Sequence, residues 1–247
     1  MTKKILITGA NGQLGHEMRN ALKGNNRFEC IFTDVAELDI CNAEAVKQII
    51  ADNHIDYIVN CAAYTQVDKA EDNAELCKKI NTDAVENLAR AAADYGARMI
   101  HISTDYVFNG RGYRPYTEDM VPDPQSVYGS TKLEGEKILT DICPESIIIR
   151  TAWLYSPYGN NFVKTMLHLG EEREELSVVA DQIGTPTCAA DLAQAILVIL
   201  QADTFVPGTY HFSDEGVCSW YDFTVTIHRL AGITTLSLIH ISEPTRL

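Results

Sequence analysis

Tyr128 and Lys132 stand four positions apart in the stretch Tyr128-Gly129-Ser130-Thr131-Lys132. On a helix, side chains with this spacing lie one above the other on the same face. A phenol has a pKa near ~10, which is too high for a proton donor that works near neutral pH. A neighbouring ammonium favours phenolate and would lower the tyrosine pKa by roughly 2. The pair therefore predicts an acid–base site, although an exposed Tyr–Lys helix face would give the same spacing.

A glycine-rich turn near the N-terminus supplies a second candidate site. Gly9, Gly12 and Gly15 follow a short apolar run, and the next residues can form a helix. Glycines in such a strand–turn–helix unit allow a tight turn and close backbone approach to a pyrophosphate, which the helix N-terminus attracts. Asp34 stands 34 − 15 = 19 residues further on, where a carboxylate can accept hydrogen bonds from ribose hydroxyls and repel a 2′-phosphate. The turn predicts dinucleotide binding, with NADH favoured over NADPH, whereas a plain tight turn is the simpler alternative.

Two further strand ends carry small or polar side chains. Asn60-Cys61-Ala62-Ala63 ends one apolar run, and Ser103-Thr104-Asp105 ends the next. Ligands of doubly wound sheets bind at the carboxyl ends of the strands. We therefore expect these residues, the glycine turn and the Tyr128–Lys132 pair to share one edge of a sheet. Hydroxyls that only cap strand ends are the alternative for Ser103 and Thr104.

The elements that must position these residues alternate along the chain. Strands are expected at 4–8, 30–34, 57–63, 98–104 and 146–153, with helices at 17–23, 43–52, 74–95 and 126–142. This alternation, with apolar strands, predicts an α/β fold of Rossmann type: a doubly wound parallel sheet buried on both faces.

The chain beyond residue 153 is expected to add a smaller unit. Helices are predicted at 161–169, 191–201 and 220–231, and strands at 176–180 and 208–213. We expect residues 1–150 to form an NAD(P)-binding domain and residues 151–235 to form a substrate-binding part with some elements returning to the sheet. Residues 236–247 lack the preceding pattern and are expected to be a non-native tail on a chain truncated near Thr235.

Composition excludes several classes of protein. A net charge of −14 over 247 residues argues against a nucleic-acid partner. No apolar run approaches the ~20 residues that span a membrane. The seven cysteines are scattered without a Cys-x-x-Cys pair, which favours reduced thiols and a cytoplasmic protein. No metal-binding motif is present, so no metal site is predicted, and His101 within an apolar run is expected to be a satisfied core residue.

Together these motifs resemble the extended short-chain dehydrogenase/reductase family, and within it the enzymes that reduce a nucleotide-linked 4-keto sugar. The resemblance covers residues 3–232. It is carried by the segments ITGANGQLG (7–15), ELDI (37–40), VNCAAYTQVDKAE (59–71), HISTDYVFNG (101–110), YGSTKLEGE (128–136), RTAWLYSPYGNNFVKTM (150–166) and DQIGTPT (181–187). Related dehydratases place Asp-Glu after the strand-end Thr, whereas Tyr106 follows Thr104-Asp105 here, which fits simple reduction.

The resemblance implies reduction of the C4 keto group of dTDP-4-dehydro-L-rhamnose to dTDP-L-rhamnose, for surface polysaccharide, with hydride from NADH or NADPH. It implies that Tyr128 donates a proton to the C4 oxygen, that Lys132 tunes Tyr128 and holds the nicotinamide ribose, and that Thr104 binds the carbonyl. Asp105, Trp153 and Asn161 would contact the nucleotide sugar, with help from residues 182–187. The implied dinucleotide-binding residues are Gly9, Ala10, Asn11, Gly12, Gln13, Leu14, Gly15, Asp34, Asp39, Ile40, Cys61, Ala62, Ala63, Tyr64 and Thr65, beside Tyr128 and Lys132.

Two points limit what the resemblance implies. Some family members dimerise through a metal held by acidic residues around the position of Asp191, but Ala189-Ala190 precede it here, so a metal is not expected and a homodimer is left open. A nucleotide-sugar epimerase or dehydratase on the same fold, and a non-catalytic regulatory subunit, remain alternatives to the reductase.

Overall fold

A computed structural model describes residues 2–234 and 237–242 of the chain. Its centre is a six-stranded sheet in the order β10-β5-β4-β3-β1-β2, with every neighbouring pair parallel. The strands are β1 (Lys3–Thr8), β2 (Phe28–Phe32), β3 (Tyr57–Asn60), β4 (Arg98–Thr104), β5 (Ile147–Thr151) and β10 (Gly208–His211). The predicted Rossmann-type doubly wound sheet is therefore confirmed.

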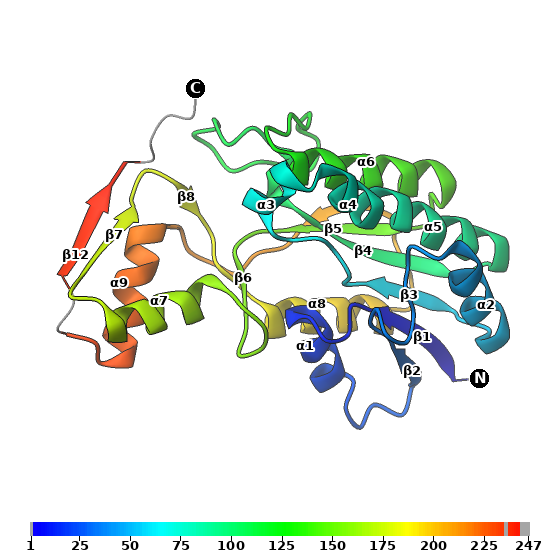
Figure 1. The fold of residues 1–247 in the computed structure, drawn as a ribbon. Helices are drawn as coiled ribbons and strands as arrows, with labels where there is room; N and C mark the ends of the chain where they lie inside the picture. Colours follow the sequence, from blue (N-terminus) through cyan, green and yellow to red (C-terminus); the bar gives the residue numbers. More distant parts are fainter. Residues whose placement is uncertain (1, 235–236, 243–247) are drawn as a thin grey trace.

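Helices cover both faces of this sheet (Figure 1). On one face lie α1 (Gln13–Ala21) and α8 (Ala189–Gln201). On the other lie α2 (Ala43–Asn53), α4 (Ala74–Lys78), α5 (Ala84–Tyr95) and α6 (Val127–Ile142). α3 (Val67–Asp72) follows β3. Because α8 and β10 both join this sheet, part of the chain beyond residue 150 belongs to the main layer structure.

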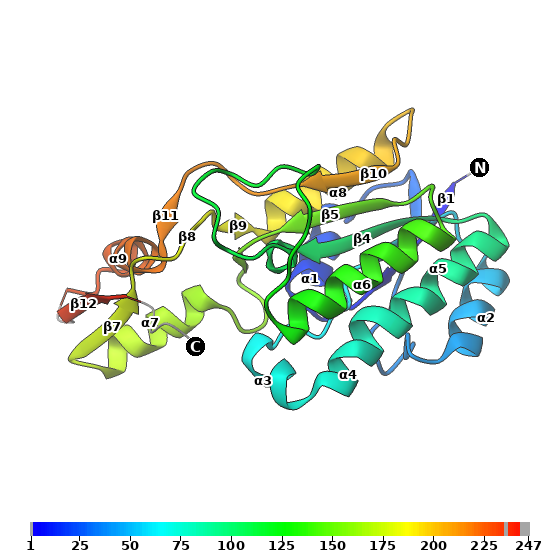
Figure 2. The same cartoon turned by 90° about the horizontal axis from the view of Figure 1, so that it is seen from above.

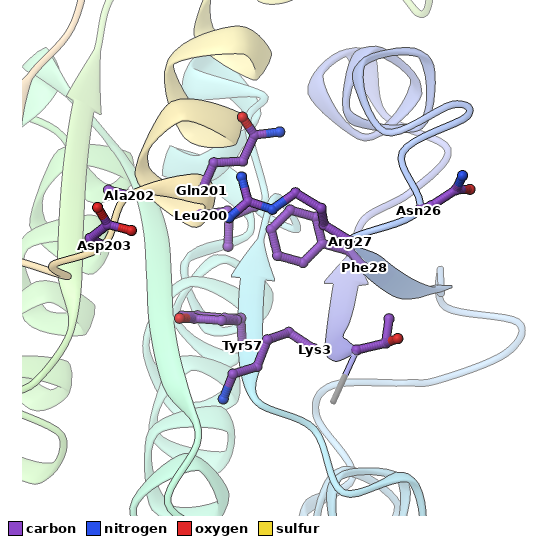
Figure 3. Close-up of a pocket in the computed structure, with 10 residues that line it drawn as sticks. Lys3, Asn26, Arg27, Phe28, Tyr57, Leu200, Gln201, Ala202 and Asp203 are labelled. Atoms are coloured by element: carbon purple, nitrogen blue, oxygen red, sulfur yellow. The ribbon is translucent and has the colours of Figure 1, made fainter.

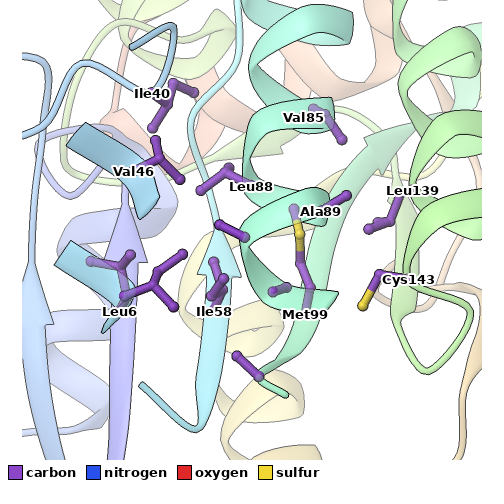
Figure 4. Packing of buried hydrophobic residues seen from close by; sticks show 14 of the residues in the cluster. Leu6, Ile40, Val46, Ile58, Val85, Leu88, Ala89, Met99, Leu139 and Cys143 are labelled. Carbon is purple, nitrogen blue, oxygen red and sulfur yellow. The ribbon is translucent and has the colours of Figure 1, made fainter. Parts of the chain in front are cut away.

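Alternation along the buried strands divides the core into two layers. Leu6 and Ile58 pack with Val46 of α2, Leu88 of α5 and Met99 of β4 (Figure 4). The neighbouring strand residues point to the opposite face, since successive side chains of a strand alternate. That second cluster includes Ile5, Ile7, Met18, Ile100, Leu192 and Ile196. Two-sided burial explains why the strands read as continuous apolar runs.

A smaller unit lies beyond the carboxyl ends of the strands (Figure 2). It contains α7 (Phe162–Glu172), β7 (Glu175–Val179) and α9 (Trp220–Ala231), joined by the short strands β6 (Leu154–Tyr155), β8 (Ile183–Gly184), β9 (Thr187–Cys188) and β11 (Cys218–Ser219). Met166, Val178 and Ile227 form its buried core. The expected boundaries at residues 150 and 235 stay a prediction.

Part of the expected non-native tail is ordered against this unit. Residues Ser237–Ile241 form β12, which pairs in parallel with β7. Leu236 and residues 243–247 lie outside the described residues. The origin of segment 236–247 stays a prediction.

Several elements differ in extent from the expectation, most clearly the helix predicted over 74–95. A π-helical turn, Lys79–Asp83, divides it into α4 and α5. Within this turn the buried Asn81 bonds both backbone groups of Tyr64, accepting from its N–H at 2.9 Å and donating to its carbonyl at 3.1 Å. We attribute the π-helical turn to this side chain, because single π-turns inside helices are frequent at functional sites.

In the described part of the chain, no helix is long and apolar enough to cross a bilayer.

Candidate active site

The glycine turn occupies the point where the strand order reverses. The chain passes from β1 to β2 on one side and returns to β3 on the other, which is where doubly wound folds bind ligands. Gly9 has a φ of +62°, and a Cβ there would lie 2.6 Å from the backbone nitrogen of Ala62. A Cβ on Gly15 would lie 2.3 Å from the Gly9 carbonyl oxygen. Only glycine fits either position, so the turn and α1 pack directly against the end of β3.

The start of α1 presents backbone donors to this edge. Gly12 is the N-cap residue and supplies no side-chain acceptor to the first turn, which contains Gln13 and Leu14. Uncapped N–H groups and the positive end of the helix dipole together suit a phosphate. Asp34 lies beside the turn, because its Oδ2 accepts from Asn11 N at 2.9 Å. Ala10 is held by a backbone bond to Thr33 at 3.0 Å.

Polar side chains fix the loop that follows β3. Asn60 is fully buried, and its Oδ1 accepts from Ala62 N at 3.2 Å, while Asn81 holds Tyr64. Burial raises the pKa of the Cys61 thiol to about 12, so the thiol stays protonated. The loop residues proposed to bind the dinucleotide, Cys61, Ala62, Ala63, Tyr64 and Thr65, therefore form one segment next to Gly9.

Asp39 and Ile40 lie in the connection between β2 and α2. Asp39 uses its carboxylate locally, accepting from Cys41 N at 2.9 Å. Ile40 is buried in the same apolar cluster that Ala62 packs against. Ile40 is thereby linked to the loop after β3, whereas Asp39 is exposed.

Thr104 ends β4 at the same edge and is 5% exposed. Its Oγ1 donates to Asp105 Oδ1 at 3.1 Å and accepts from Tyr106 N at 3.2 Å, which begins the 3-10 turn Asp105–Val107. Burial raises the pKa of Asp105 to about 6, although the Thr104 hydrogen bond opposes this. The Thr104 hydroxyl, next to the Asp105 carboxyl group, is therefore available at the end of β4 to bind a carbonyl oxygen.

Tyr128 and Lys132 are buried on α6, with 9% and 1% of their surfaces exposed. Ser126 caps this helix by accepting from Gly129 N at 3.1 Å, which fixes where the first turn begins. The ring of Tyr128 meets Tyr106 edge-on at 5.5 Å. Tyr128 also interacts with the Thr104 side chain. These contacts exclude the exposed-face explanation and join the helix to the end of β4.

The amine of Lys132 faces the sheet. Its Nζ donates to the Ile102 carbonyl at 2.7 Å and lies 3.2 Å from His101 Nε2. Burial lowers the pKa of Lys132 to about 8. The expected lowering of the Tyr128 pKa is wrong for this structure, where burial raises that pKa and only the Thr104 interaction opposes it. The reason is that the phenol is buried, which disfavours the phenolate.

Trp153 and Asn161 lie at the base of the smaller unit. Trp153 has a φ of +49°, unusual for a bulky residue, and its ring stacks on Trp220 at 3.4 Å. Within the 182–187 loop, Gly184 packs against the Trp153 indole, and Gln182 accepts from Trp220 Nε1 at 3.1 Å. Asn161 caps α7 and donates to Gln13 Oε1 at 2.9 Å. This bond brings a predicted substrate residue to the glycine turn.

A surface hollow of about 590 Å³ lies at the opposite end of the sheet (Figure 3). Lys3, Phe28 and Tyr57, which line it, are the first residues of β1, β2 and β3. None of the predicted site residues lines this hollow. Since ligands of this fold bind at carboxyl ends, size does not make it the active site.

Sequence reasoning did not identify the residues that support the site. Asn60 was treated as a small strand-end residue and Asn81 as part of a helix face, yet each holds backbone of the loop after β3. His101 is satisfied within the core, as expected, but its partner is Lys132. A polar residue within an apolar run is the signal that could have found Asn60 and His101, whereas Asn81 lies in a polar stretch and carries no such signal.

The chain is similar in sequence and in fold to proteins of a known family. The sequence matches the RmlD substrate binding domain family over residues 3–245. A dTDP-4-dehydrorhamnose reductase of Aggregatibacter actinomycetemcomitans is 44% identical over 228 residues, or 91% of this chain and 78% of the relative.

Two solved structures are also similar. A dTDP-4-dehydrorhamnose reductase from Clostridium acetobutylicum is 50% identical with a TM-score of 0.93, over 97% of this chain and 84% of that one. A dTDP-4-dehydrorhamnose reductase from Bacillus anthracis, in complex with NADP, is 42% identical with a TM-score of 0.93, over 98% and 85%. The resemblance found in the sequence is thereby confirmed, and the chain belongs to the RmlD substrate binding domain family.

Proposed function

We propose that this protein reduces the C4 keto group of dTDP-4-dehydro-L-rhamnose to dTDP-L-rhamnose with hydride from a nicotinamide cofactor. The observation that carries the proposal is the burial of Tyr128 and Lys132 beside Thr104, at the same sheet edge as the glycine turn. Its relatives at 44–50% identity are named as reductases of this sugar nucleotide.

The residues of the glycine turn fit a dinucleotide. A Cβ at Gly9 or Gly15 would fill the space in which backbone approaches backbone, and the first turn of α1 keeps its N–H groups free of side-chain caps. Gly12, Gln13 and Leu14 would bind the pyrophosphate through these groups. Asp34, which already contacts Asn11 N, would accept from ribose hydroxyls.

The chain's own residues would handle the proton. A bound nicotinamide would supply the hydride to C4. Tyr128 would give its phenolic proton to the C4 oxygen as negative charge develops there. Thr104 would turn its hydroxyl from Asp105 to the same oxygen and stabilise that charge. Lys132, once protonated, would stabilise the phenolate that Tyr128 leaves behind.

The preference between the two nicotinamide cofactors is part of the proposal. The Asp34 carboxylate next to the turn favours NADH, because it would repel the 2′-phosphate of NADPH. The Bacillus anthracis relative is in complex with NADP, so a mild preference is expected rather than a strict one. A cytoplasmic location is proposed as well, supported by seven cysteines that are all free thiols.

Oxidation of NADH by the purified protein with dTDP-4-dehydro-L-rhamnose tests the proposal, with product identified by mass and NMR. Stoichiometric loss of NADH and formation of dTDP-L-rhamnose is the expected result. Conversion of a sugar nucleotide without added NADH would favour an epimerase or dehydratase that recycles its cofactor. Cofactor binding without turnover of any sugar nucleotide would favour a regulatory subunit.

A further inference from the structure

A buried chain of hydrogen bonds runs from the first strand to the lysine of α6. Thr8 Oγ1 donates to Asn60 Oδ1 at 2.7 Å, Asn60 Nδ2 lies 3.0 Å from His101 Nδ1, and His101 Nε2 lies 3.2 Å from Lys132 Nζ. Each of the four residues is at most 1% exposed. Groups this deeply buried must satisfy one another, so the direction of every bond in the chain can be deduced.

The orientation of Asn60 fixes the tautomer of His101. Asn60 Oδ1 accepts from the backbone N–H of Ala62 at 3.2 Å as well as from Thr8, and a backbone N–H can only donate. The amide NH₂ of Asn60 therefore points at His101 Nδ1, which must carry a lone pair. A ring with a lone pair on Nδ1 is neutral, and burial, which keeps the pKa of His101 well below its usual value, favours that state. The single ring proton then resides on Nε2.

This tautomer constrains the charge of Lys132. An ammonium has three N–H donors and no acceptor, so it would present a donor to the Nε2–H donor. A neutral amine has one lone pair, which can accept from Nε2–H while an N–H donates to the Ile102 carbonyl. Only the neutral amine satisfies both contacts.

We propose that His101 is a positioning residue that holds Lys132 as a neutral amine, and that uptake of a proton at Nζ drives the amino group off His101 Nε2. The proton adds to the Nζ lone pair that had accepted from His101, while His101 keeps its own. Resting on the proposed function, one further step follows: the charge that assists Tyr128, one turn earlier on α6, is present only when Lys132 has left His101.

The other charged groups around Lys132 do not explain a neutral amine. Glu136, one turn further along α6, favours the ammonium, but its carboxylate is paired with Arg150 at 2.7 Å and also accepts from Ser103. Cys77 of α4 also favours the ammonium. The groups that act on Lys132 are His101 of β4, Glu136 of α6 and Cys77 of α4. One step further out, Arg150 of β5 pairs with Glu136, and Asp105 of the 3-10 turn acts on Tyr128.

Long-range ¹H–¹⁵N NMR of the histidine rings tests the proposal without reference to activity. In the wild-type protein, the His101 signals, assigned by their loss in His101→Gln, are expected to show the Nε2–H tautomer throughout the neutral range. The ¹⁵N signal of Lys132, assigned with Lys132→Met, is expected to show a neutral amine when the pH is raised to the mildly alkaline range. An Nδ1–H tautomer overturns the proposal. So does a Lys132 that remains an ammonium in the mildly alkaline range, as the other lysines do.

Asn60→Asp reverses the bond between residue 60 and His101 Nδ1. A carboxylate accepts from Thr8, Ala62 N–H and an Nδ1–H together, so His101 should switch tautomer and offer Nε2 as an acceptor to an ammonium. The proton affinity of Lys132 is then expected to rise at least about tenfold, the equivalent of one hydrogen bond gained. An unchanged tautomer in folded Asn60→Asp would contradict the mechanism.

Activity profiles give a second measurement. His101→Asn places an amide near Nδ1 and loses the contact with Lys132, whereas His101→Gln places an N–H donor near Nε2. We expect the alkaline limb of the reductase pH profile to move to higher pH in His101→Asn but to stay near wild type in His101→Gln. His228→Asn controls for loss of a buried histidine, because His228 lies in the smaller unit, where its Nε2 bonds the Met166 carbonyl of α7 at 2.7 Å.

Equal shifts in both His101 variants, or a matching shift in His228→Asn, would overturn a role through Lys132. If the NMR results are as expected but NADH is not oxidised, the tautomer inference stands and the proposed function fails. The two hypotheses can therefore be separated.

Discussion

Asn161 Nδ2 donates to Gln13 Oε1 across 2.9 Å, which ties the smaller unit to the turn that follows β1. The same amide donates to the Ser156 carbonyl at 2.8 Å, and its Oδ1 accepts from Lys164 N at 3.1 Å as the cap of α7. One side chain therefore both starts a helix of the smaller unit and fixes that helix against the glycine turn.

Replacing Asn161 with Asp should separate these two roles. Asp keeps the capping acceptor but loses both donor contacts, to Gln13 and to the Ser156 carbonyl, so stability should fall by about 1 kcal/mol while KM for the nucleotide sugar rises. Asn161→Ala also loses the cap, at a further cost of about 1 kcal/mol. Urea unfolding and steady-state kinetics of both variants check this. Equal stability losses would show that capping is not what Asn161 contributes.

The sequence indicated which strand ends meet, because parallel strands bring Thr8, Asn60 and Thr104 to one edge. It did not indicate which hydrogen bonds hold these strand ends in place. The π-turn at Asn81 and the φ of +49° at Trp153 depend on partners distant in sequence. The pKa of Tyr128 was predicted from the spacing of Tyr128 and Lys132, but the desolvation that raises it depends on the packed structure. The local sequence pattern thus specified the helix and sheet layers and the edge of the sheet that carries the site. Tertiary contacts determine the hydrogen bonds and pKa values of the site residues.

Tyr128→Phe should remove the proton donor and leave the rest of α6 intact. The ring of Tyr128 packs against Tyr106 and a small cluster with Ala70 and Cys77, and phenylalanine preserves these contacts. We expect kcat to fall by about 100- to 10,000-fold, the usual contribution of general acid catalysis. Fluorescence titration should give a cofactor Kd within about twofold of wild type. Near-normal turnover would remove Tyr128 as the donor.

Asp34→Asn tests whether Asp34 recognises the cofactor ribose and selects between NADH and NADPH. The amide retains an oxygen to accept from Asn11 N, so the glycine turn should keep its shape. Removing one charge near a 2′-phosphate should improve use of NADPH relative to NADH by about fivefold, since charges ~4 Å apart interact by about 1 kcal/mol even in water. The ratio of kcat/KM for the two cofactors measures this. An unchanged ratio would mean that Asp34 does not set the preference.

Asp105 should make stability fall as the pH rises from about 4 to about 6. Its pKa is raised to about 6 by burial, above its ordinary value of 3.8. Between these values the folded protein retains a proton that the unfolded chain has lost, so folding weakens with rising pH and levels off above about 6. Asp105→Asn abolishes this titration. Relative to wild type, the variant should therefore be more stable at pH 7 than at pH 4, by about 2 kcal/mol.

Urea unfolding of both proteins at the two pH values measures that difference. Asp119→Asn is the matched control, because a hydrogen bond from Thr117 lowers the pKa of the exposed Asp119. Its stabilising effect is lost only below about pH 4, so the stability of this variant relative to wild type should change little between pH 4 and pH 7. If Asp119→Asn shows the same change between the two pH values as Asp105→Asn, burial does not control the ionisation of Asp105.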